Sequence, residues 1–204
     1  YAGYCDGTAT DAVIAHEWGH AYTEYTSGLI YQYQSGALNE SYSDVWGETI
    51  DLINNYQDEG ENLGVRTSTA CSPGSVRWKV GEDATAFGGA IRDMWNPNCN
   101  GDPGRVLDTA NYFCGTTDSG GVHSNSGVPN HQYALLVDGG TYNGYTMSGL
   151  GFVKAAHLWW KAQTTYLTAS SDFANFADAL EAAANDLIGI NLQGLSTTGT
   201  AAGL

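Results

Sequence analysis

The sequence predicts a mainly α-helical protein with long irregular loops and little β-structure. Apolar residues recur with helical spacing in several separate stretches, most clearly over residues 152–167 and 172–188. Between these stretches lie segments rich in Gly, Asn, Asp and Ser, which favour loops. Few stretches alternate apolar and polar residues as half-buried strands do, and no internal repeat is visible.

The expected helices follow one another along the chain. After Gly-rich residues 1–10, a first helix begins near Asp11, where Thr10 or Asp11 can cap it, and ends by Gly28. After a loop, a second helix begins near Leu38. Further helices are expected over 84–95, 131–137, 152–167 and 172–188, long loops over 57–81 and 96–126, and a Gly/Tyr turn region over 139–151.

Composition limits the class of protein. The 204 residues carry 7 Lys+Arg against 22 Asp+Glu, a net charge of −15, which argues against binding nucleic acid or an anionic membrane surface. The sequence contains no run of 18 apolar residues, so no segment is expected to span a bilayer. We expect one domain over residues 1–195 and a linker-like Ser/Thr/Gly/Ala tail over 196–204. Because the first residue is Tyr1, we also expect a processed or excised piece.

Four cysteines, Cys5, Cys71, Cys99 and Cys114, bear on the compartment. No two form a Cys-x-x-Cys pair, and their even number in a Lys-poor chain predicts a secreted protein with two disulfides. A Cys99–Cys114 bond would close a short loop and leave Cys5 to pair with Cys71. The alternative is four reduced, buried thiols.

One motif carries metal chemistry. His16 and His20 stand at positions i and i+4, so a helix presents both imidazoles on one face, where they can bind one ion. Glu17 lies beside them and can take a proton from water. A catalytic zinc site needs a third protein ligand, which could be a downstream His, Asp or Glu. Glu40 is the preferred candidate, because it opens a second helix that could pack against the first. Asp44, one turn on, can fix the tautomer of a ligand imidazole.

The stretch from His16 to Asp51 resembles the zinc site of the thermolysin-like metallopeptidases, including the 19 residues between His20 and Glu40. The resemblance implies a helical domain like the C-terminal domain of that family. It implies His16, His20 and Glu40 as Zn²⁺ ligands, with Asp44 as the partner of His16. Further blocks follow in the family's order: Gly81-Glu82-Asp83, Ile91-Arg92, residues 118–127 and the late helices from Lys154 to Gly189.

The resemblance also implies catalytic roles. Glu17 matches the general base, which the motif alone already indicates. His123 matches a histidine that stabilises the transition state, and Asp118 matches the aspartate that orients it. Tyr31 matches a second donor to the oxyanion. Without the resemblance, a loop histidine is more often simply exposed, and nothing singles out Tyr31 among 13 tyrosines.

The implied activity is that of a zinc endopeptidase acting on polypeptides. Arg92 matches an arginine that binds a substrate carbonyl; its alternative is an ion pair with Asp93 or a surface carboxylate. Val13, Val80 and Ile91 would line an apolar pocket, which implies cleavage on the N-terminal side of hydrophobic residues.

Two other functions stay open. One is an aminopeptidase-type zinc exopeptidase, although a Gly-x-Met-Glu-Asn element that reads a free amine is absent. The other is a non-catalytic binding module derived from a peptidase, which would be expected to have lost Glu17 or a ligand, and neither is lost.

Calcium is the second metal that the resemblance suggests. Asp51 and Glu82 fall on positions where the family often binds Ca²⁺. However, Arg77 and Lys79 stand where acidic ligands are common, and cations there would expel the ion or form ion pairs instead. We therefore expect one weak calcium site or none.

The chain departs from the family at both ends. Only fifteen residues precede His16, where the family has a β-rich N-terminal domain, and the family's final helix has no good counterpart after Gly189. We expect a separate N-terminal fragment or domain to complete the substrate cleft, because an endopeptidase holds its substrate against a strand edge. The face where it would sit should be apolar or aromatic.

Overall fold

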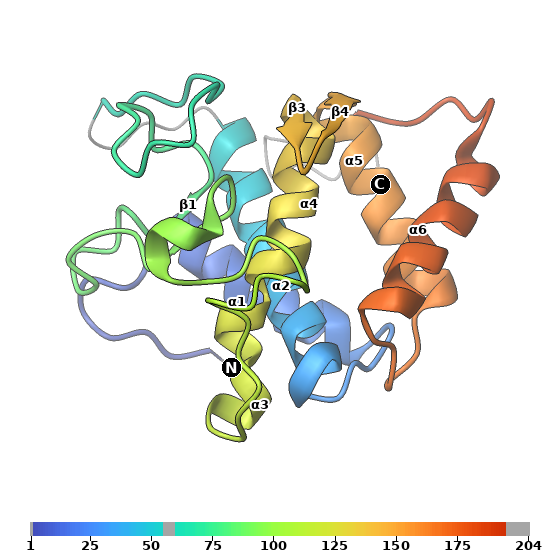
Figure 1. Ribbon diagram of the computed structural model, residues 1–204, viewed down its shortest axis with the longest axis horizontal. Coiled ribbons are helices and arrows are strands. Elements are labelled where there is room, and N and C mark those ends of the chain that lie inside the picture. Colours follow the sequence, from blue (N-terminus) through green and yellow to red (C-terminus); the bar gives the residue numbers. More distant parts are fainter. Residues whose placement is uncertain (1, 55–59, 195–204) are drawn as a thin grey trace.

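The computed structural model describes residues 2–54 and 60–194, and the expected tail over 196–204 lies outside them. Two helices side by side form the centre: α2 (Tyr33–Asn54) and α4 (Gly127–Asp138), with α1 (Asp11–Glu24) packed along α2 (Figure 1). On one side of this centre, α5 (Gly151–Lys161), a π-helical turn η2 (Ala162–Tyr166) and α6 (Phe173–Leu187) pack together. No helix within the described ranges is long and apolar enough to cross a membrane.

The smaller elements surround this helical centre. They are β1 (Lys79–Val80), β2 (Arg92–Asp93), a 3₁₀ turn η1 (Pro97–Asn100), α3 (Asp118–Asn125), β3 (Gly139–Tyr142) and β4 (Tyr145–Ser148). The strands form two antiparallel pairs, β1 with β2 and β3 with β4. The mainly α-helical prediction is confirmed.

Small residues let α1 and α2 approach closely. A Cβ atom on Gly19 would come within 2.7 Å of Ser43 Cα, and one on Gly47 within 2.7 Å of the Ala12 carbonyl oxygen. The buried face of α1 consists of Ala12, Ala15, Gly19 and Thr23. Because large side chains are absent from this contact, the histidines beside it on α1 can reach carboxylates on α2.

Aromatic rings from four helices fill the core. Trp159 of α5 has its ring centroid 4.8 Å from that of Tyr42, 4.8 Å from that of Phe176 and 5.1 Å from that of Tyr133. The two buried phenols are hydrogen-bonded: Tyr42 donates to the Trp159 carbonyl at 3.2 Å, and Tyr133 pairs with Thr49 at 2.9 Å. These contacts fix α2 and α4, which carry much of the site.

Several expected helices are confirmed. The Thr10 side chain caps α1 by accepting from the Val13 amide, and Asp172 caps α6 in a reciprocal arrangement with Asn175. The expected helices over 131–137 and 152–167 correspond to α4 and to α5 with η2. The second helix begins earlier than Leu38, at Tyr33.

The helix expected over 84–95 is wrong. Gly88 and Gly89 have positive φ, which interrupts a helix, and the segment forms turns that end in β2. Val80 lies opposite Arg92 in the β1–β2 pair. The loop expected over 96–126 instead contains η1 and α3, and the turn region over 139–151 contains the β3–β4 hairpin.

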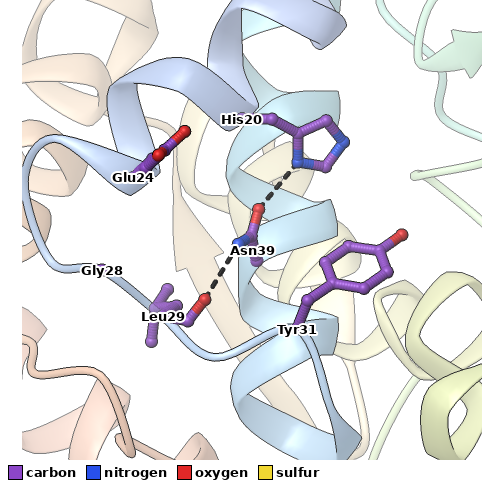
Figure 2. Close-up of a pocket in the computed structure, with 6 residues that line it drawn as sticks. All are labelled: His20, Glu24, Gly28, Leu29, Tyr31 and Asn39. Atoms are coloured by element: carbon purple, nitrogen blue, oxygen red, sulfur yellow. Dashed lines mark hydrogen bonds between the residues drawn. The ribbon is translucent and has the colours of Figure 1, made fainter.

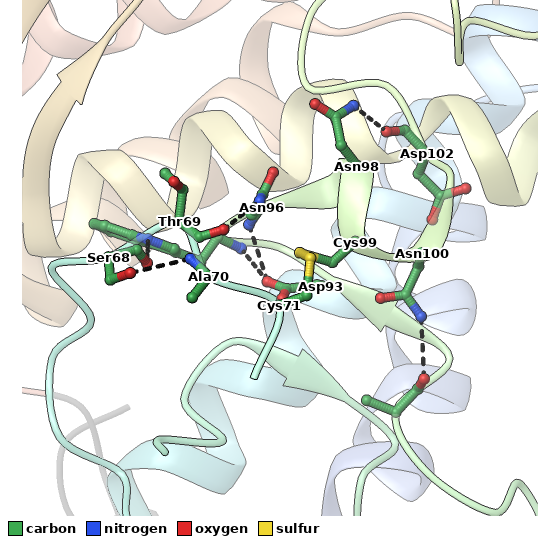
Figure 3. Close-up of a disulfide and its surroundings, with 12 residues drawn as sticks. Ser68, Thr69, Ala70, Cys71, Asp93, Asn96, Asn98, Cys99, Asn100 and Asp102 are labelled. Atoms are coloured by element: carbon green, nitrogen blue, oxygen red, sulfur yellow. Dashed lines mark hydrogen bonds between the residues drawn. A yellow bond between two sulfur atoms is a disulfide. The ribbon is translucent and has the colours of Figure 1, made fainter. Parts of the chain in front are cut away.

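The expected disulfide pairing is also wrong. The bond joins Cys71 to Cys99, with Cα atoms 5.3 Å apart (Figure 3). Cys5 and Cys114 are free and exposed. The cause is tertiary: the segment before Cys71 lies against the segment before Cys99. Asn96 and Trp95 donate to the Thr69 and Ser68 carbonyls at 2.7 and 3.1 Å.

Candidate active site

The structure brings His16, His20 and Glu40 together from α1 and α2. The two imidazole Nε2 atoms lie 3.1 Å apart. Carboxylate oxygens of Glu40 lie 3.7 Å from the Nε2 atom of His16 and 3.3 Å from that of His20. Each residue offers one ligand atom within 4.8 Å of the other two, as a single ion requires.

The partners of the two histidines fix their tautomers. His16 Nδ1 lies 2.9 Å from an Asp44 carboxylate oxygen, and His20 Nδ1 lies 2.7 Å from the Asn39 amide oxygen. The Asn39 NH₂ group donates to the Leu29 carbonyl at 3.0 Å, so its oxygen must face His20. Both Nδ1 atoms therefore carry the proton and both Nε2 atoms present lone pairs to each other.

A cation fits this arrangement. Two facing lone pairs cannot hydrogen-bond to each other, and a negative carboxylate stands beside them. Glu40 is buried, and its Oε2 atom has no hydrogen-bond partner. Two neutral imidazoles and one carboxylate are a donor set that zinc accepts at catalytic sites.

Asp44 connects the metal centre to the surrounding structure. Besides His16, it accepts from Arg92 at 2.6 and 2.7 Å and from Asn130 at 2.7 Å. Burial alone raises the pKa of Asp44, but the Arg92 guanidinium and His16 outweigh it and hold that pKa well below its usual range. The alternative pairing of Arg92 with Asp93 is wrong, because Asp93 pairs with Arg66 instead.

His123 and Asp118 lie together on α3. The Asp118 carboxylate accepts from the His123 backbone amide at 3.0 Å and lies 2.6 Å from its Nδ1 atom. Asp118 and the three residues after it have positive φ, which turns the chain sharply and lets the carboxylate reach back to the imidazole. The His123 side chain is 50% exposed, and its Nε2 atom lies 3.4 Å from Glu40.

Tyr31 joins His123 to Glu40. Its hydroxyl donates to the Glu40 carboxylate and lies 3.1 Å from His123 Nε2. Burial, with Glu40 beside it, raises the pKa of Tyr31 well above its usual value, so it keeps its proton. Since that proton points to Glu40, the Tyr31–His123 contact is satisfied when the imidazole donates through Nε2.

Glu17 is exposed on α1 beside the metal-ligand pair. Burial and the negative charge of Glu17 raise the pKa of Tyr4. Tyr4 could not be singled out beforehand, because residues 1–10 show no pattern. The N-terminal segment is held in place where Gly7 accepts from the Ala86 amide at 3.0 Å.

The structure places two of the three expected pocket residues, Val80 and Ile91, next to each other. Ile91 donates through its amide to the Val80 carbonyl at 2.9 Å, and Arg92 lies opposite Val80 in the strand pair. Val80 is buried and Ile91 is exposed. Val13 lies on α1, three residues before His16.

A second acidic group lies where α1, α2 and the Gly81 turn meet. Carboxylate oxygens of Asp11, Asp51 and Asp83 lie within 4.8 Å of one another. Burial, reinforced by neighbouring carboxylates, raises the pKa of Asp51 to about 8 and that of Glu82 to about 9. Glu48 is buried nearby, and neither of its carboxylate oxygens has a hydrogen-bond partner.

The two cations expected to oppose calcium there are engaged elsewhere. Arg77 forms a paired contact with Asp138 at 2.6 and 2.7 Å, and Lys79 lies 3.2 Å from Asp93. The expectation that Arg77 and Lys79 would expel calcium from this group therefore loses its physical reason.

Sequence reasoning missed two residues that hold the centre, Asn39 and Asn130. Asn39 precedes Glu40 directly, so its position on α2 was a usable signal. Asn130 follows Asp44 by 86 residues and gave none.

A family model described as the alpha-helical domain of thermolysin metallopeptidase matches residues 27–202. The chain belongs to the thermolysin-like metallopeptidases. It is 40% identical over 196 residues to a zinc metalloproteinase of Renibacterium salmoninarum, an alignment that covers 94% of this chain and 33% of that protein. It is 35% identical to thermolysin of Alicyclobacillus acidocaldarius, over 89% of this chain and 30% of that protein.

Among solved structures, the chain is similar to the precursor of protealysin, a metalloproteinase from Serratia proteamaculans. The TM-score is 0.55 at 25% identity, covering 86% of this chain and 51% of that one. The chain thus spans about a third or less of the length of the relatives named above by sequence, and about half of this structural relative.

Proposed function

We propose that this protein is a zinc-dependent endopeptidase, with His16, His20 and Glu40 as ligands. The observation that carries the proposal is the pair of imidazole Nε2 atoms 3.1 Å apart beside the buried Glu40 carboxylate. Asp44 and Asn39 set the tautomers of His16 and His20, as hydrogen-bond partners of metal-bound histidines usually do.

Zinc held there would polarise the scissile carbonyl and lower the pKa of water. Glu17 takes a proton from the attacking water while the water oxygen forms a bond to the carbonyl carbon. When the carbon–nitrogen bond breaks, Glu17 gives that proton to the departing amine. Its exposed position on α1, one residue from His16, leaves it accessible to both.

His123 and Tyr31 stabilise the oxyanion in this proposal. His123, oriented by Asp118, donates through Nε2, and the Tyr31 hydroxyl turns its proton from Glu40 to the same oxygen. Their two polar atoms lie 3.1 Å apart and converge on Glu40, so one substrate oxygen near the ligand set can reach both.

Substrate contacts complete the proposal. Arg92 binds a backbone carbonyl while Asp44 holds its guanidinium in place. Val80 and Ile91, adjacent to Arg92 in the strand pair, and Val13 on α1 receive a hydrophobic side chain. Cleavage therefore falls on the N-terminal side of a hydrophobic residue.

We assign the catalytic unit to residues 1–195, and the relatives matched by sequence are about three times as long as this chain. We propose that a further N-terminal part or fragment covers the outer face of α1 and completes the cleft. Exposed apolar and aromatic side chains on and beside this helix support the proposal: Ile14, Trp18, Tyr22 and Tyr25. A disulfide between Cys71 and Cys99 fits action outside the cell.

We also assign a calcium ion to the second acidic group. Asp11, Asp51 and Asp83 supply the oxygen ligands that calcium prefers, and the negative charges of Asp51 and Asp83 help to raise the pKa of Glu82. A calcium ion would compensate the negative charges of these carboxylates, which Arg77 and Lys79 do not neutralise.

Metal analysis beside proteolysis tests the main proposal. The zinc-loaded protein should cleave casein, lose activity with a chelator and regain it with zinc. Glu17→Gln should keep zinc and lose nearly all activity, because a carboxamide cannot take the proton. Activity within tenfold of the unmodified protein would show that Glu17 is not the base.

Two substrates separate the alternatives. An N-acetylated peptide that is cut internally supports an endopeptidase, whereas cleavage only of free N-termini indicates an aminopeptidase. Binding of peptides without any turnover, in the zinc-loaded protein, indicates a binding module.

A further inference from the structure

An open cavity of about 570 Å³ lies beside the metal ligands, on the side of His20 (Figure 2). His20 and Glu24 project from α1, Asn39 from α2, and Tyr31 from the segment between these helices. The lining is completed by Gly28 and Leu29. The volume is sufficient for a long side chain.

Glu24 is the one uncommitted charge in this lining. It is exposed, lies one helical turn after His20 on the same face of α1, and has no hydrogen bond or ion pair with any described residue. The other polar groups have partners: His20 and Asn39 bind each other, and Tyr31 binds Glu40. A free carboxylate at the edge of a cavity attracts a cation.

The axis of α1 relates this cavity to the bond that is cut. Val13 lies before the His16–His20 pair and Glu24 after it, so the two residues stand on opposite sides of the metal ligands. At 1.5 Å per residue, Glu24 lies about 9 Å beyond the middle of the pair. An extended peptide covers about 3.3 Å per residue, so this corresponds to two or three residues.

We propose that the cavity receives a Lys or Arg side chain of the substrate, two or three residues before the scissile bond, and that Glu24 selects it. This rests on the proposed function, in which Val13 contacts the residue after that bond. Because Glu24 is exposed, we expect a selectivity of roughly two- to five-fold rather than an absolute requirement.

Matched peptides test the assignment. N-acetylated, C-amidated peptides carry either Arg or its neutral analogue citrulline at one of the three positions before the scissile bond, and kcat/KM is measured for each. The unmodified zinc-loaded protein should favour Arg roughly two- to five-fold at the second or third position. Glu24→Gln should bring the ratio close to one, and Glu24→Arg should bring it below one.

Two further arms keep the result decisive. Glu181→Gln removes an exposed carboxylate from α6, outside the cavity lining, and should leave the ratio unchanged. The same peptides are also titrated against zinc-loaded Glu17→Gln, with and without Glu24→Gln, and the binding ratio is measured without turnover.

A ratio near one in the protein with Glu24 intact, or a ratio that survives Glu24→Gln, overturns the assignment. Absence of cleavage for every peptide, with the Arg preference retained in binding, overturns the proposed peptidase function while supporting the role of Glu24.

Discussion

Gly19 of α1 touches the backbone of Ser43 on α2, so closely that a methyl group on Gly19 would come within 2.7 Å of Ser43 Cα. This contact sets the separation between the helix that carries His16 and His20 and the helix that carries Glu40. The geometry of the metal centre therefore depends on the absence of one methyl group.

Gly19→Ala should weaken zinc binding at least tenfold and lower the free energy of unfolding by about 1–3 kcal/mol. Alanine normally favours a helix over glycine by about 1 kcal/mol, but the obstructing atom here is backbone and cannot move aside. Competition with a chromogenic chelator and urea unfolding measure the two effects. Gly3→Ala, where nothing lies within 4 Å, is the control. Unchanged zinc affinity in Gly19→Ala would contradict the argument.

Asp44→Asn should destabilise the protein by about 3–5 kcal/mol, because it leaves the buried Arg92 charge without its partner. It should also weaken zinc binding, since Asp44 orients His16. Urea unfolding of the metal-free protein isolates the first effect from the second. A loss below 1 kcal/mol would mean that Arg92 finds another partner.

Asn39→Ala should separate orientation of a ligand from general stability. Asn39 accepts from His20 and carries no charge, so we expect zinc affinity to fall about tenfold or more with a smaller loss of stability than in Asp44→Asn. Zinc titration and unfolding of both variants give the comparison. Equal stability losses in the two variants would assign Asn39 a purely structural role.

His123→Ala should reduce kcat by an amount equivalent to about 2–4 kcal/mol, with KM little changed, because the oxyanion exists only in the transition state. Tyr31→Phe should act on the same quantity, and the double variant should lose less than the sum, since the two groups serve one oxygen. Steady-state kinetics on one peptide decide it. A change confined to KM would make His123 a substrate-binding residue.

Local sequence patterns predicted the parts of the site that depend on one helix. The spacing of His16 and His20 and the capping residue Thr10 are visible along a short stretch, and the structure has them as expected. Asn130 and the true partner of Cys71 were invisible, because each contact joins distant segments. The expected helix over 84–95 failed for a related reason: pairing with β1 and burial of Arg92 against Asp44 outweigh its helical spacing.

The four cysteines should fall into two classes, one disulfide-bonded pair and two free thiols. The Cys71–Cys99 bond closes a loop with a sequence separation of 28, and the chain-entropy model assigns such a crosslink about 3–4 kcal/mol. Replacing both cysteines by Ala should lower the free energy of unfolding by up to that amount. In the unreduced native protein, an alkylating reagent should label Cys5 and Cys114 only, as mass mapping would reveal. Labelling of Cys71 or Cys99 would contradict the pairing.

Calcium should stabilise the protein more at pH 8 than at pH 5. Burial and neighbouring carboxylates raise the pKa of Asp51 to about 8 and that of Glu82 to about 9, whereas carboxyls of an unfolded chain have pKa values of about 4. Between pH 4 and 8 the calcium-free folded state holds protons that the unfolded chain has released. The free energy of unfolding therefore falls as the pH rises through this window.

Calcium replaces those protons as the compensating charge, so its benefit is largest where they are lost. Thermal unfolding of the zinc-loaded protein, with and without millimolar calcium at each pH, measures the difference. Asp51→Asn should remove most of the calcium increment and flatten the pH dependence, because it deletes one raised carboxyl and one ligand together. Glu181→Asn, on the exposed face of α6, should leave both unchanged. An equal calcium effect at the two pH values would show that Asp51 and Glu82 are not where the ion binds.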